Sequence, residues 1–311
     1  MAALRTAVIG VGYMGRFHAQ KFASCRGATL VAVADTNAAR AQDVAREVGC
    51  APQADYRRLL DSLDAAVVAV PTELHYRVVR DCLEARVNVL VEKPLARSVK
   101  EADALLALAR RRRVLLQVGH LERFNPAFRA LAAHRARPLF IDIERLAPFK
   151  ARGTDVDVVL DLMIHDLDLV LALEGAPVEH VSACGFSVLT DAIDIANARI
   201  EFASGCVASV SASRVSQSPV RKLRVFRHDA YVSADLQGQK LRHVRKGGAG
   251  IEESEQAFPR ADELRVQAED FLRAVGERAA PLVSGEQGRQ ALALALQIGA
   301  LVEERLARHR E

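Results

Sequence analysis

Apolar runs alternate with amphipathic segments through the first 120 residues of the chain. Short, continuous apolar runs rich in Val and Ala are typical of strands that are covered on both faces. The expected strands are Thr6–Ile9, Thr29–Ala34, Ala65–Val70, Asn88–Val91 and Val114–Val118, with helices near 13–25, 37–48, 73–86 and 98–112 between them. Strands that alternate with helices over short connections predict an α/β fold, with a parallel sheet that is doubly wound by helices on both faces.

The pattern changes after residue 120. Short alternating runs separated by turn residues predict a largely antiparallel sheet, with helices before and after it. The expected strands are 139–146, 178–189, 194–203, 206–215, 220–227 and 230–236; the expected helices follow Asn125-Pro126 and cover 157–173, 262–278 and 285–309; and 247–250 is expected to be a loop. We therefore expect two domains, residues 1–120 and 121–311, and the last helix could pack back on the first domain.

A glycine motif, GVGYMG at residues 10–15, follows the first expected strand and opens the first helix. Glycines in this setting let backbone N–H groups approach a pyrophosphate at a helix N-terminus. A carboxylate 20 residues later, at the end of the second strand, can accept hydrogen bonds from a ribose and would repel a 2′-phosphate. The motif predicts NAD in preference to NADP as the cofactor. Its candidate contacts are Gly10, Gly12, Tyr13, Met14, Gly15, Asp35 and Thr36.

A second motif, Glu92-Lys93-Pro94, follows another expected strand. Ligands of parallel sheets bind outside the carboxyl ends of the strands, so Lys93 should point into the cofactor crevice. The proline restricts Lys93 to extended conformations, and a partly desolvated lysine beside a positively charged nicotinamide would give up its proton more readily. An exposed lysine at a strand end fits these three residues equally well.

A third segment follows the strand that ends near residue 70. Pro71, Thr72 and His75 could line the nicotinamide side of the crevice, with Thr72 as the N-cap of the next helix. A plain helix cap followed by an exposed histidine explains the same residues.

Polar residues interrupt an apolar helical pattern in DLMIHDLDLV, residues 161–170. At about 100° per residue, Asp161, His165 and Asp168 fall within about 60° of one another. Asp161 and His165 could share a hydrogen bond that orients the imidazole as a proton acceptor. A metal site, a solvated face and a polar patch at an interface are the alternatives, and no third metal ligand stands at helical spacing.

Composition narrows the class of protein. Half of the 311 residues are hydrophobic, 26% are charged and the net charge is +4. This is ordinary globular composition, and the small positive charge suits an anionic small molecule better than nucleic acid. The run Arg110–Arg113 follows a helical Ala/Leu pattern, so we expect it to mark a helix C-terminus, where cations complement the helix dipole.

The five cysteines are widely spaced and form no C-x-x-C pair. We therefore expect reduced thiols in a cytoplasmic protein and no zinc or other metal site. No apolar run reaches transmembrane length and the N-terminus enters a strand at once, so we expect neither a membrane segment nor a signal peptide.

Taken together, GVGYMG, the EKP motif about 80 residues later and D-x-x-x-H-D-x-D near residue 165 resemble the glucose-fructose oxidoreductase/inositol 2-dehydrogenase (Gfo/Idh/MocA) family. The resemblance implies an NAD-binding Rossmann domain, residues 1–120. It also implies an α+β domain, residues 121–311, whose open and mostly antiparallel sheet serves substrate binding and oligomerisation. A homodimer or homotetramer is expected. Lys93 and His165 would act at the sugar hydroxyl with Asp161 in support, and which of the two is the general base stays open.

A narrower similarity covers VGHLERFNPAF (118–128) and DVVLDLMIHDLDL (157–169). These segments are similar to a subgroup of the family that oxidises the 3-hydroxyl group of UDP-N-acetylglucosamine or its uronic acid. The candidate substrate contacts are Arg123, Asn125, Lys150 and Arg152. The sequence thus predicts an NAD-dependent dehydrogenase of a sugar nucleotide. The alternatives are a dehydrogenase of a free sugar or inositol, and a non-catalytic regulator that binds NAD and a sugar.

Overall fold

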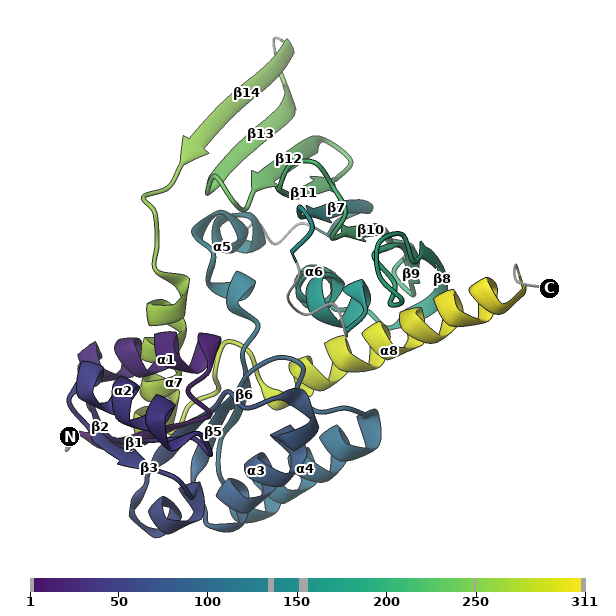
Figure 1. The fold of residues 1–311 in the computed structure, drawn as a ribbon. Helices are drawn as coiled ribbons and strands as arrows, with labels where there is room; N and C mark the ends of the chain where they lie inside the picture. The colour runs from purple at the N-terminus through teal and green to yellow at the C-terminus, as the bar shows by residue number, and fades with distance from the viewer. Residues whose placement is uncertain (1–2, 134–136, 151–155, 249, 309–311) are drawn as a thin grey trace. The chain divides into compact units, whose positions relative to one another are not determined.

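The computed structural model describes residues 3–133, 137–150, 156–248 and 250–308 (Figure 1). The chain divides into two compact units. Unit 1 consists of Met1–Leu121 and Asp262–Arg289, and unit 2 consists of Glu122–Ala261 and Gln290–Glu311. Residues 262–289, which the sequence pattern groups with the second domain, are therefore part of unit 1. The cofactor and substrate roles assigned to the two domains stay predictions.

Unit 1 contains a six-stranded sheet, sheet A, in the strand order β3-β2-β1-β4-β5-β6. Its strands are β1 (Leu4–Ile9), β2 (Ala28–Ala34), β3 (Ala51–Gln53), β4 (Ala65–Val68), β5 (Asn88–Val91) and β6 (Leu116–Val118). All neighbouring strands are parallel, which confirms the expected parallel sheet. Strand β3 is not among the predicted strands, because a three-residue strand is too short to show a period.

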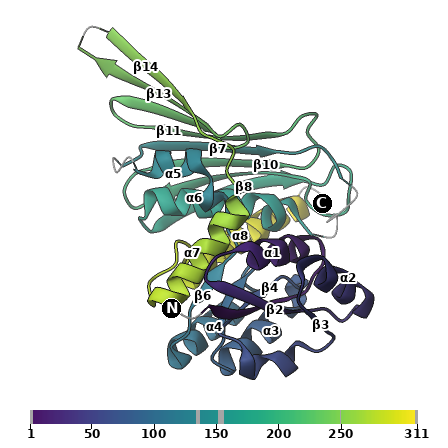
Figure 2. The same ribbon diagram turned by 90° about the vertical axis from the view of Figure 1, so that its left-hand side faces the viewer.

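Helices cover both faces of sheet A (Figures 1 and 2). The helices of unit 1 are α1 (Tyr13–Ser24), α2 (Ala38–Val48), α3 (Thr72–Glu84), α4 (Val99–Arg112) and α7 (Glu263–Glu277), with a short 3₁₀ helix at Tyr56–Ser62. On one face, α1, α2 and α7 lie together, and α3 and α4 lie on the other. This arrangement confirms the doubly wound architecture.

Helix α7 belongs to unit 1 because its apolar side chains complete the core beneath α1. Phe271 of α7 and Phe22 of α1 are fully buried, with ring centroids 6.2 Å apart. They pack with Val8, Val33 and Val67 of the central strands. Burying one such aromatic side chain contributes roughly 1.5–3 kcal/mol, so α7 adds stability to the sheet although it follows residue 121 by some 140 positions along the chain.

Unit 2 contains an eight-stranded sheet, sheet B, in the order β14-β13-β12-β11-β7-β10-β9-β8. Its strands are β7 (Phe140–Leu146), β8 (Val178–Phe186), β9 (Ile195–Phe202), β10 (Val207–Ser213), β11 (Val220–Phe226), β12 (Ala230–Asp235), β13 (Lys240–Gly247) and β14 (Gly250–Ala257). Strands β7 and β10 are parallel and the other neighbours are antiparallel, as expected for the second domain.

One face of sheet B packs against helices α5 (Pro126–Ala133), α6 (Ile164–Glu174) and the later part of α8 (Gly285–Arg308). The alternation along β9 explains this one-sided burial. Ala196, Ala198, Ile200 and Phe202 are buried, whereas the residues between them are exposed or half-buried. A period of two places every second side chain on the same face of a strand.

Strands β13 and β14 were missed by the sequence analysis. Their hairpin is rich in charged residues, so it lacks the apolar alternation of the other strands. Cross-strand ion pairs join Arg242 to Glu253 and Arg245 to Glu252. The expected loop at 247–250 lies where β13 ends and β14 begins. Charged side chains on an edge hairpin disfavour pairing with other chains.

Among the described residues, no helix is long and apolar enough to cross a membrane.

Candidate functional site

The glycine motif forms the turn between β1 and α1. Gly10 adopts φ = +84°, and a Cβ at this position would lie 2.8 Å from the backbone of Ala69. A Cβ on Gly15 would lie 1.8 Å from the carbonyl oxygen of Gly10. Contacts this short cannot be accommodated without moving the backbone. The packing of the protein itself therefore requires glycine at both positions.

Gly12 is different, because an added Cβ would meet no protein atom within 4 Å. The residue is the N-cap of α1, and no side chain caps the helix there. Open space at the first turn of a helix suits a pyrophosphate, whose oxygen atoms accept hydrogen bonds from the backbone N–H groups. The loop therefore fits a dinucleotide, and a side chain at position 12 would occupy the space that the ligand needs.

Asp35 lies at the end of β2 and holds the glycine turn. Its Oδ2 accepts a hydrogen bond of 2.9 Å from the backbone N–H of Val11, and its Oδ1 accepts one of 2.9 Å from Asn37. The guanidinium of Arg40 lies 3.4 Å from Oδ2. Thr36 next to it is exposed. A carboxylate anchored in this way is presented at the position expected for a ribose contact.

Lys93 is the second residue after β5 and follows Glu92, whose side chain pairs with that of the buried His18. Glu92 Oε1 lies 2.6 Å from Nε2 of His18, and Glu92 Oε2 accepts a hydrogen bond of 3.3 Å from the backbone N–H of Lys93. Burial acts to raise the pKa of Glu92, but the hydrogen bond with His18 and the charges of His18 and Lys93 outweigh it and lower the pKa. An ionised Glu92 thus fixes the backbone from which the Lys93 side chain projects. The Lys93–Pro94 peptide bond is cis.

Thr72 is not the helix N-cap that the sequence suggested. Pro71 occupies the N-cap position of α3, and Thr72 is the first helical residue, without a capping hydrogen bond from a side chain. The alternative of an exposed histidine is also wrong, since His75 is 1% exposed. Nδ1 and Nε2 of the ring lie 2.7 Å from the carbonyl oxygen of Pro94 and 2.9 Å from that of Val70. Burial lowers the pKa of His75, and the contacts of its ring with Val70 and Pro94 join the start of α3 to the EKP segment.

In unit 2, the helix that carries the DLMIHDLDLV segment begins irregularly. The sequence predicted one α-helix over 157–173, but Val159–Met163 forms a π-helical turn before α6 begins at Ile164. Because a π turn is wider than an α turn, the α-helical angles do not apply to Asp161. The shared face of Asp161 and His165 therefore does not follow from regular helix geometry. Both side chains are half-buried. Such π turns occur frequently at functional sites.

A buried charge cluster around this helix was not predicted from the sequence. Arg145 of β7 donates two hydrogen bonds, of 2.9 and 2.7 Å, to the carboxylate of Asp166, the residue after His165. It donates a third, of 2.9 Å, to Glu122, which also accepts one of 3.0 Å from Arg221. Burial acts to lower the pKa of Arg145, but the charges of Asp166 and Glu122 outweigh it and raise the pKa, so the guanidinium is charged. No local pattern could reveal pairs so distant in sequence.

The four candidate substrate contacts differ in burial and in hydrogen-bond partners. Arg123 is buried, with Nη1 3.6 Å from Asp168 Oδ1. Asn125 is also buried; its side chain donates to the carbonyl of Leu236 at 2.8 Å and accepts from the N–H of Ala127 at 3.0 Å, as a structural residue does. The remaining two candidates are Lys150, which is exposed, and Arg152, which lies outside the described residues. Their contacts with substrate stay predictions.

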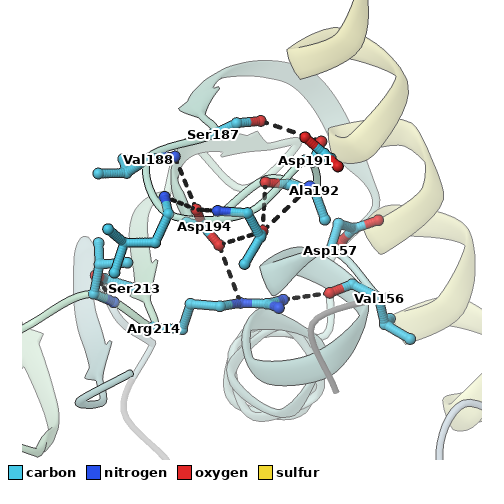
Figure 3. Close-up of polar contacts among 12 residues, drawn as sticks. Val156, Asp157, Ser187, Val188, Asp191, Ala192, Asp194, Ser213 and Arg214 are labelled. Atoms are coloured by element: carbon cyan, nitrogen blue, oxygen red, sulfur yellow. Dashed lines mark hydrogen bonds and ion pairs between the residues drawn. The ribbon is translucent and has the colours of Figure 1, made fainter. Parts of the chain in front are cut away.

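The segment before the π turn is held by a second buried carboxylate, Asp194 (Figure 3). Its Oδ2 accepts hydrogen bonds from the backbone N–H groups of residues 188–190, at 2.6–2.9 Å, and its Oδ1 accepts one from the hydroxyl of Thr190. Arg214 Nε lies 3.8 Å from Oδ1, and the same guanidinium donates to the carbonyl of Val156. Asp194 and Arg214 thus fix the backbone at Val156, three residues before the π turn that carries Asp161 begins.

Burial acts to raise the pKa of Asp194, but the hydrogen bonds from the backbone N–H groups of Leu189 and Val188 and from Thr190 outweigh it. Together they lower the pKa to about 2. Among the described residues, no group of three or more His, Cys, Asp or Glu side chains is arranged to hold a metal ion.

Comparisons with known proteins place these features in context. Residues 4–120 match the family model described as "Oxidoreductase family, NAD-binding Rossmann fold", and residues 131–232 match that of the "GFO/IDH/MocA C-terminal domain". The first match covers the glycine loop, Asp35 and the EKP motif. The second covers the helix with Asp161 and His165.

The relatives extend the likeness over the whole chain. A UDP-N-acetylglucosamine 3-dehydrogenase of Acidithiobacillus ferrooxidans is 40% identical over 316 residues, which is 99% of this chain and 100% of that protein. Its solved structure superposes with a TM-score of 0.93, over 98% of this chain and 99% of that one. A scyllo-inositol 2-dehydrogenase (NAD(+)) of Bacillus subtilis is 33% identical over 232 residues, 68% of each chain.

Proposed function

Since this chain belongs to the Gfo/Idh/MocA family of NAD-binding oxidoreductases, we propose that it oxidises the 3-hydroxyl group of a UDP-N-acetylglucosamine-type sugar nucleotide. The observation that carries the proposal is the likeness to the UDP-N-acetylglucosamine 3-dehydrogenase, which extends over the full chain at 40% identity. The inositol dehydrogenase that resembles the chain is less similar and covers about two thirds of it.

The proposed reaction removes a hydride and a proton from one secondary alcohol. When bound, NAD supplies the acceptor for the hydride that leaves the sugar carbon. Lys93 or His165 accepts the proton of the hydroxyl group, and Asp161 is a supporting carboxylate. The products are a 3-keto sugar nucleotide, NADH and a protonated base. Positioning of the reacting groups supplies much of the acceleration, and base catalysis adds about 10²–10⁴-fold.

The parts of the site have distinct roles in this proposal. The glycine turn and Asp35 hold the dinucleotide, while Glu92 and His75 fix the EKP segment so that Lys93 keeps one direction. In unit 2, the Arg145 cluster holds α6 and with it His165. The positive charges of Arg123, Lys150 and Arg152 suit the diphosphate of the substrate.

Replacing the two candidate bases tests the assignment. We expect Lys93→Ala and His165→Ala each to lower kcat by about 10²–10⁴-fold, while the Kd for NAD stays within a few fold, because each change removes proton transfer and leaves the glycine turn intact. Steady-state kinetics and NAD titration measure the two effects. Lys100→Ala and His180→Ala remove exposed residues of the same types and serve as controls. Near-normal turnover in both site variants would contradict the assignment.

A substrate panel tests the substrate class. NADH formation from UDP-N-acetylglucosamine, its uronic acid, myo-inositol, scyllo-inositol and glucose separates the sugar-nucleotide activity from that of an inositol or free-sugar dehydrogenase. Turnover of an inositol alone would contradict the proposed substrate. Tight NAD binding without turnover of any substrate would favour a regulator instead.

We also propose that the protein is a cytoplasmic homodimer or homotetramer. The five cysteines are free thiols, which suits a reducing compartment. Multi-angle light scattering on the purified protein measures the oligomeric state, and a monomer at micromolar concentration would contradict the proposal.

A further inference from the structure

A cavity of about 850 Å³ lies in unit 1, away from the glycine turn. It borders Asn88 and Leu116, the first residues of β5 and β6. The glycine turn instead follows the last residue of β1, Ile9. Because sheet A is parallel, the cavity and the turn lie at opposite edges of the sheet. The cavity is therefore separate from the dinucleotide site, and its volume is in the range of small-molecule sites.

Three helices end at this cavity with an arginine in the left-handed conformation. Arg86 (φ = 62°) follows α3, while Arg113 (φ = 58°) and Arg278 (φ = 55°) are the C-caps of α4 and α7. Glycine is the usual residue at such positions, and the left-handed conformation costs other residues roughly 1–2 kcal/mol. Three arginines from distant parts of the sequence adopt this unfavourable conformation, and all three line the same cavity.

The cavity carries an excess of positive charge. Arg110 and Arg112 join the three left-handed arginines, and Glu286 is the single carboxylate among the lining residues that the structure describes. Glu286 already pairs with Arg110 at 2.8 Å. Within the described part of the chain, the other four arginines form no ion pair, and Nε of Arg112 is buried without a hydrogen-bond partner.

Helix dipoles alone do not account for these arginines. Three helix C-termini together carry roughly −1.5 elementary charges. The carboxylate of Glu286 brings the negative charge to about −2.5, which offsets only about half of the positive charge of the five guanidinium groups. Helix α4 moreover has three basic residues in its last turn before Arg113 is reached. A fourth basic residue, Arg113 in the left-handed conformation, adds little to the stability of the helix.

We propose that this cavity binds a phosphorylated small molecule with an apolar or aromatic part, such as a nucleoside di- or triphosphate. The planar guanidinium groups form bidentate hydrogen bonds with phosphate oxygen atoms. Leu106, Val114 and Leu116 provide an apolar lining for the uncharged part of the ligand. The site goes beyond the proposed dehydrogenase activity and does not depend on it.

Binding of ATP to the NAD-saturated full-length protein, measured by calorimetry, tests the proposal. Arg113→Asn together with Arg278→Asn removes two charges and keeps residues that tolerate the left-handed conformation. Arg111→Gln is the matched control, since Arg111 lies in the same basic run but does not line the cavity. We expect the double variant to bind ATP at least about tenfold more weakly and the control to bind within about twofold of the wild type.

Three outcomes would overturn the proposal. These are no binding of ATP to the wild-type protein at millimolar concentration, equal affinity in the wild type and the double variant, and an equal loss in the control. Pyrophosphate that binds as tightly as ATP would refute the role of the apolar lining. The melting temperature of each variant, compared with that of the wild type, verifies that the fold is retained, and because binding rather than turnover is measured, an inactive dehydrogenase would not affect the result.

Discussion

At the residue scale, the three glycines of one motif have two different functions. Gly10 and Gly15 make room for the backbone of the protein, whereas Gly12 faces open space. The motif by itself does not distinguish these functions, because all three positions carry the same letter. Only the distances from an added Cβ separate a folding requirement from a binding requirement.

Alanine substitutions should separate these functions experimentally. We expect Gly15→Ala to lower the free energy of unfolding by about 1–3 kcal/mol, because its Cβ would overlap the backbone of Gly10. Gly12→Ala should leave that free energy within about 0.5 kcal/mol of the wild type and weaken NAD binding at least about tenfold. Urea denaturation and NAD titration measure the two effects. Loss of stability in Gly12→Ala, with normal NAD affinity, would refute the distinction.

A carboxylate held by backbone N–H groups makes stability depend on pH. The pKa of Asp194 is about 2 in the folded protein, against 3.8 for an unperturbed aspartate. Its stabilisation, on the order of 2 kcal/mol, is therefore present above about pH 4 and is lost as the pH falls towards 2. We expect Asp194→Asn to lower the free energy of unfolding at pH 7 and to have a much smaller effect at pH 2–3.

Denaturant unfolding at both pH values measures this difference. Asp191→Asn in the same loop removes an exposed carboxylate and is the control. A destabilisation by Asp194→Asn that is the same at pH 7 and pH 2–3 would show that its charge is not what holds the loop.

At the element scale, ion pairs fix the helix that carries His165 to sheet B. Arg145 on β7 binds Asp166 on α6 and Glu122 on the 3₁₀ turn Leu121–Phe124. Removing one partner of a buried pair leaves the others charged and without compensation, which costs more than the pair contributes. The cluster therefore makes the position of α6 sensitive to a single residue.

Arg145→Ala should lower the free energy of unfolding by about 3–5 kcal/mol. Replacing both partners with apolar residues, as in Arg145→Met with Asp166→Leu, should recover much of the loss. Arg199→Ala removes an exposed arginine that pairs with Glu201, and its effect should stay below about 1 kcal/mol. Chemical denaturation of the four proteins measures these values. A double variant less stable than Arg145→Ala would contradict the explanation.

At the scale of the whole molecule, the chain passes between its two units three times, near residues 121, 261 and 289. Unit 1 is therefore discontinuous in sequence, and its core needs Phe271 from a segment that follows all of sheet B. The stability of unit 1 thus depends on residues 262–289 as well as on residues 1–121. A ligand that binds only folded unit 1 should stabilise it by an amount that grows with the logarithm of the ligand concentration above the Kd.

NAD at about 100 times its Kd should raise the free energy of unfolding by about 2.7 kcal/mol. NADP at the same concentration should raise it less, because Asp35 repels the 2′-phosphate. Asp35→Ser should reduce the difference between the two cofactors, since it removes that repulsion. Thermal unfolding with each cofactor measures these shifts. Equal shifts of the unfolding temperature by NAD and NADP in the wild-type protein would refute the preference for NAD. Arg40, whose guanidinium lies 3.4 Å from Asp35, would then be the next residue to replace, because it could pair with a 2′-phosphate.

The sequence alone determined the parallel sheet, the glycine turn and the helix end at Arg110–Arg113, because these depend on residues close together along the chain. The EKP and D-x-x-x-H-D-x-D motifs also predicted Lys93 and His165 as candidate bases, and these roles stay predictions. The tertiary structure alone decided the Arg145 cluster, the Asp194 anchor, the π turn at Val159–Met163 and the arginine-lined cavity. The Arg145 cluster, the Asp194 anchor and the cavity arise when burial brings together residues from different elements, and a local pattern of polar and apolar residues does not specify which of them become neighbours. The π turn is a local departure from α-helical geometry, and the same pattern does not show it.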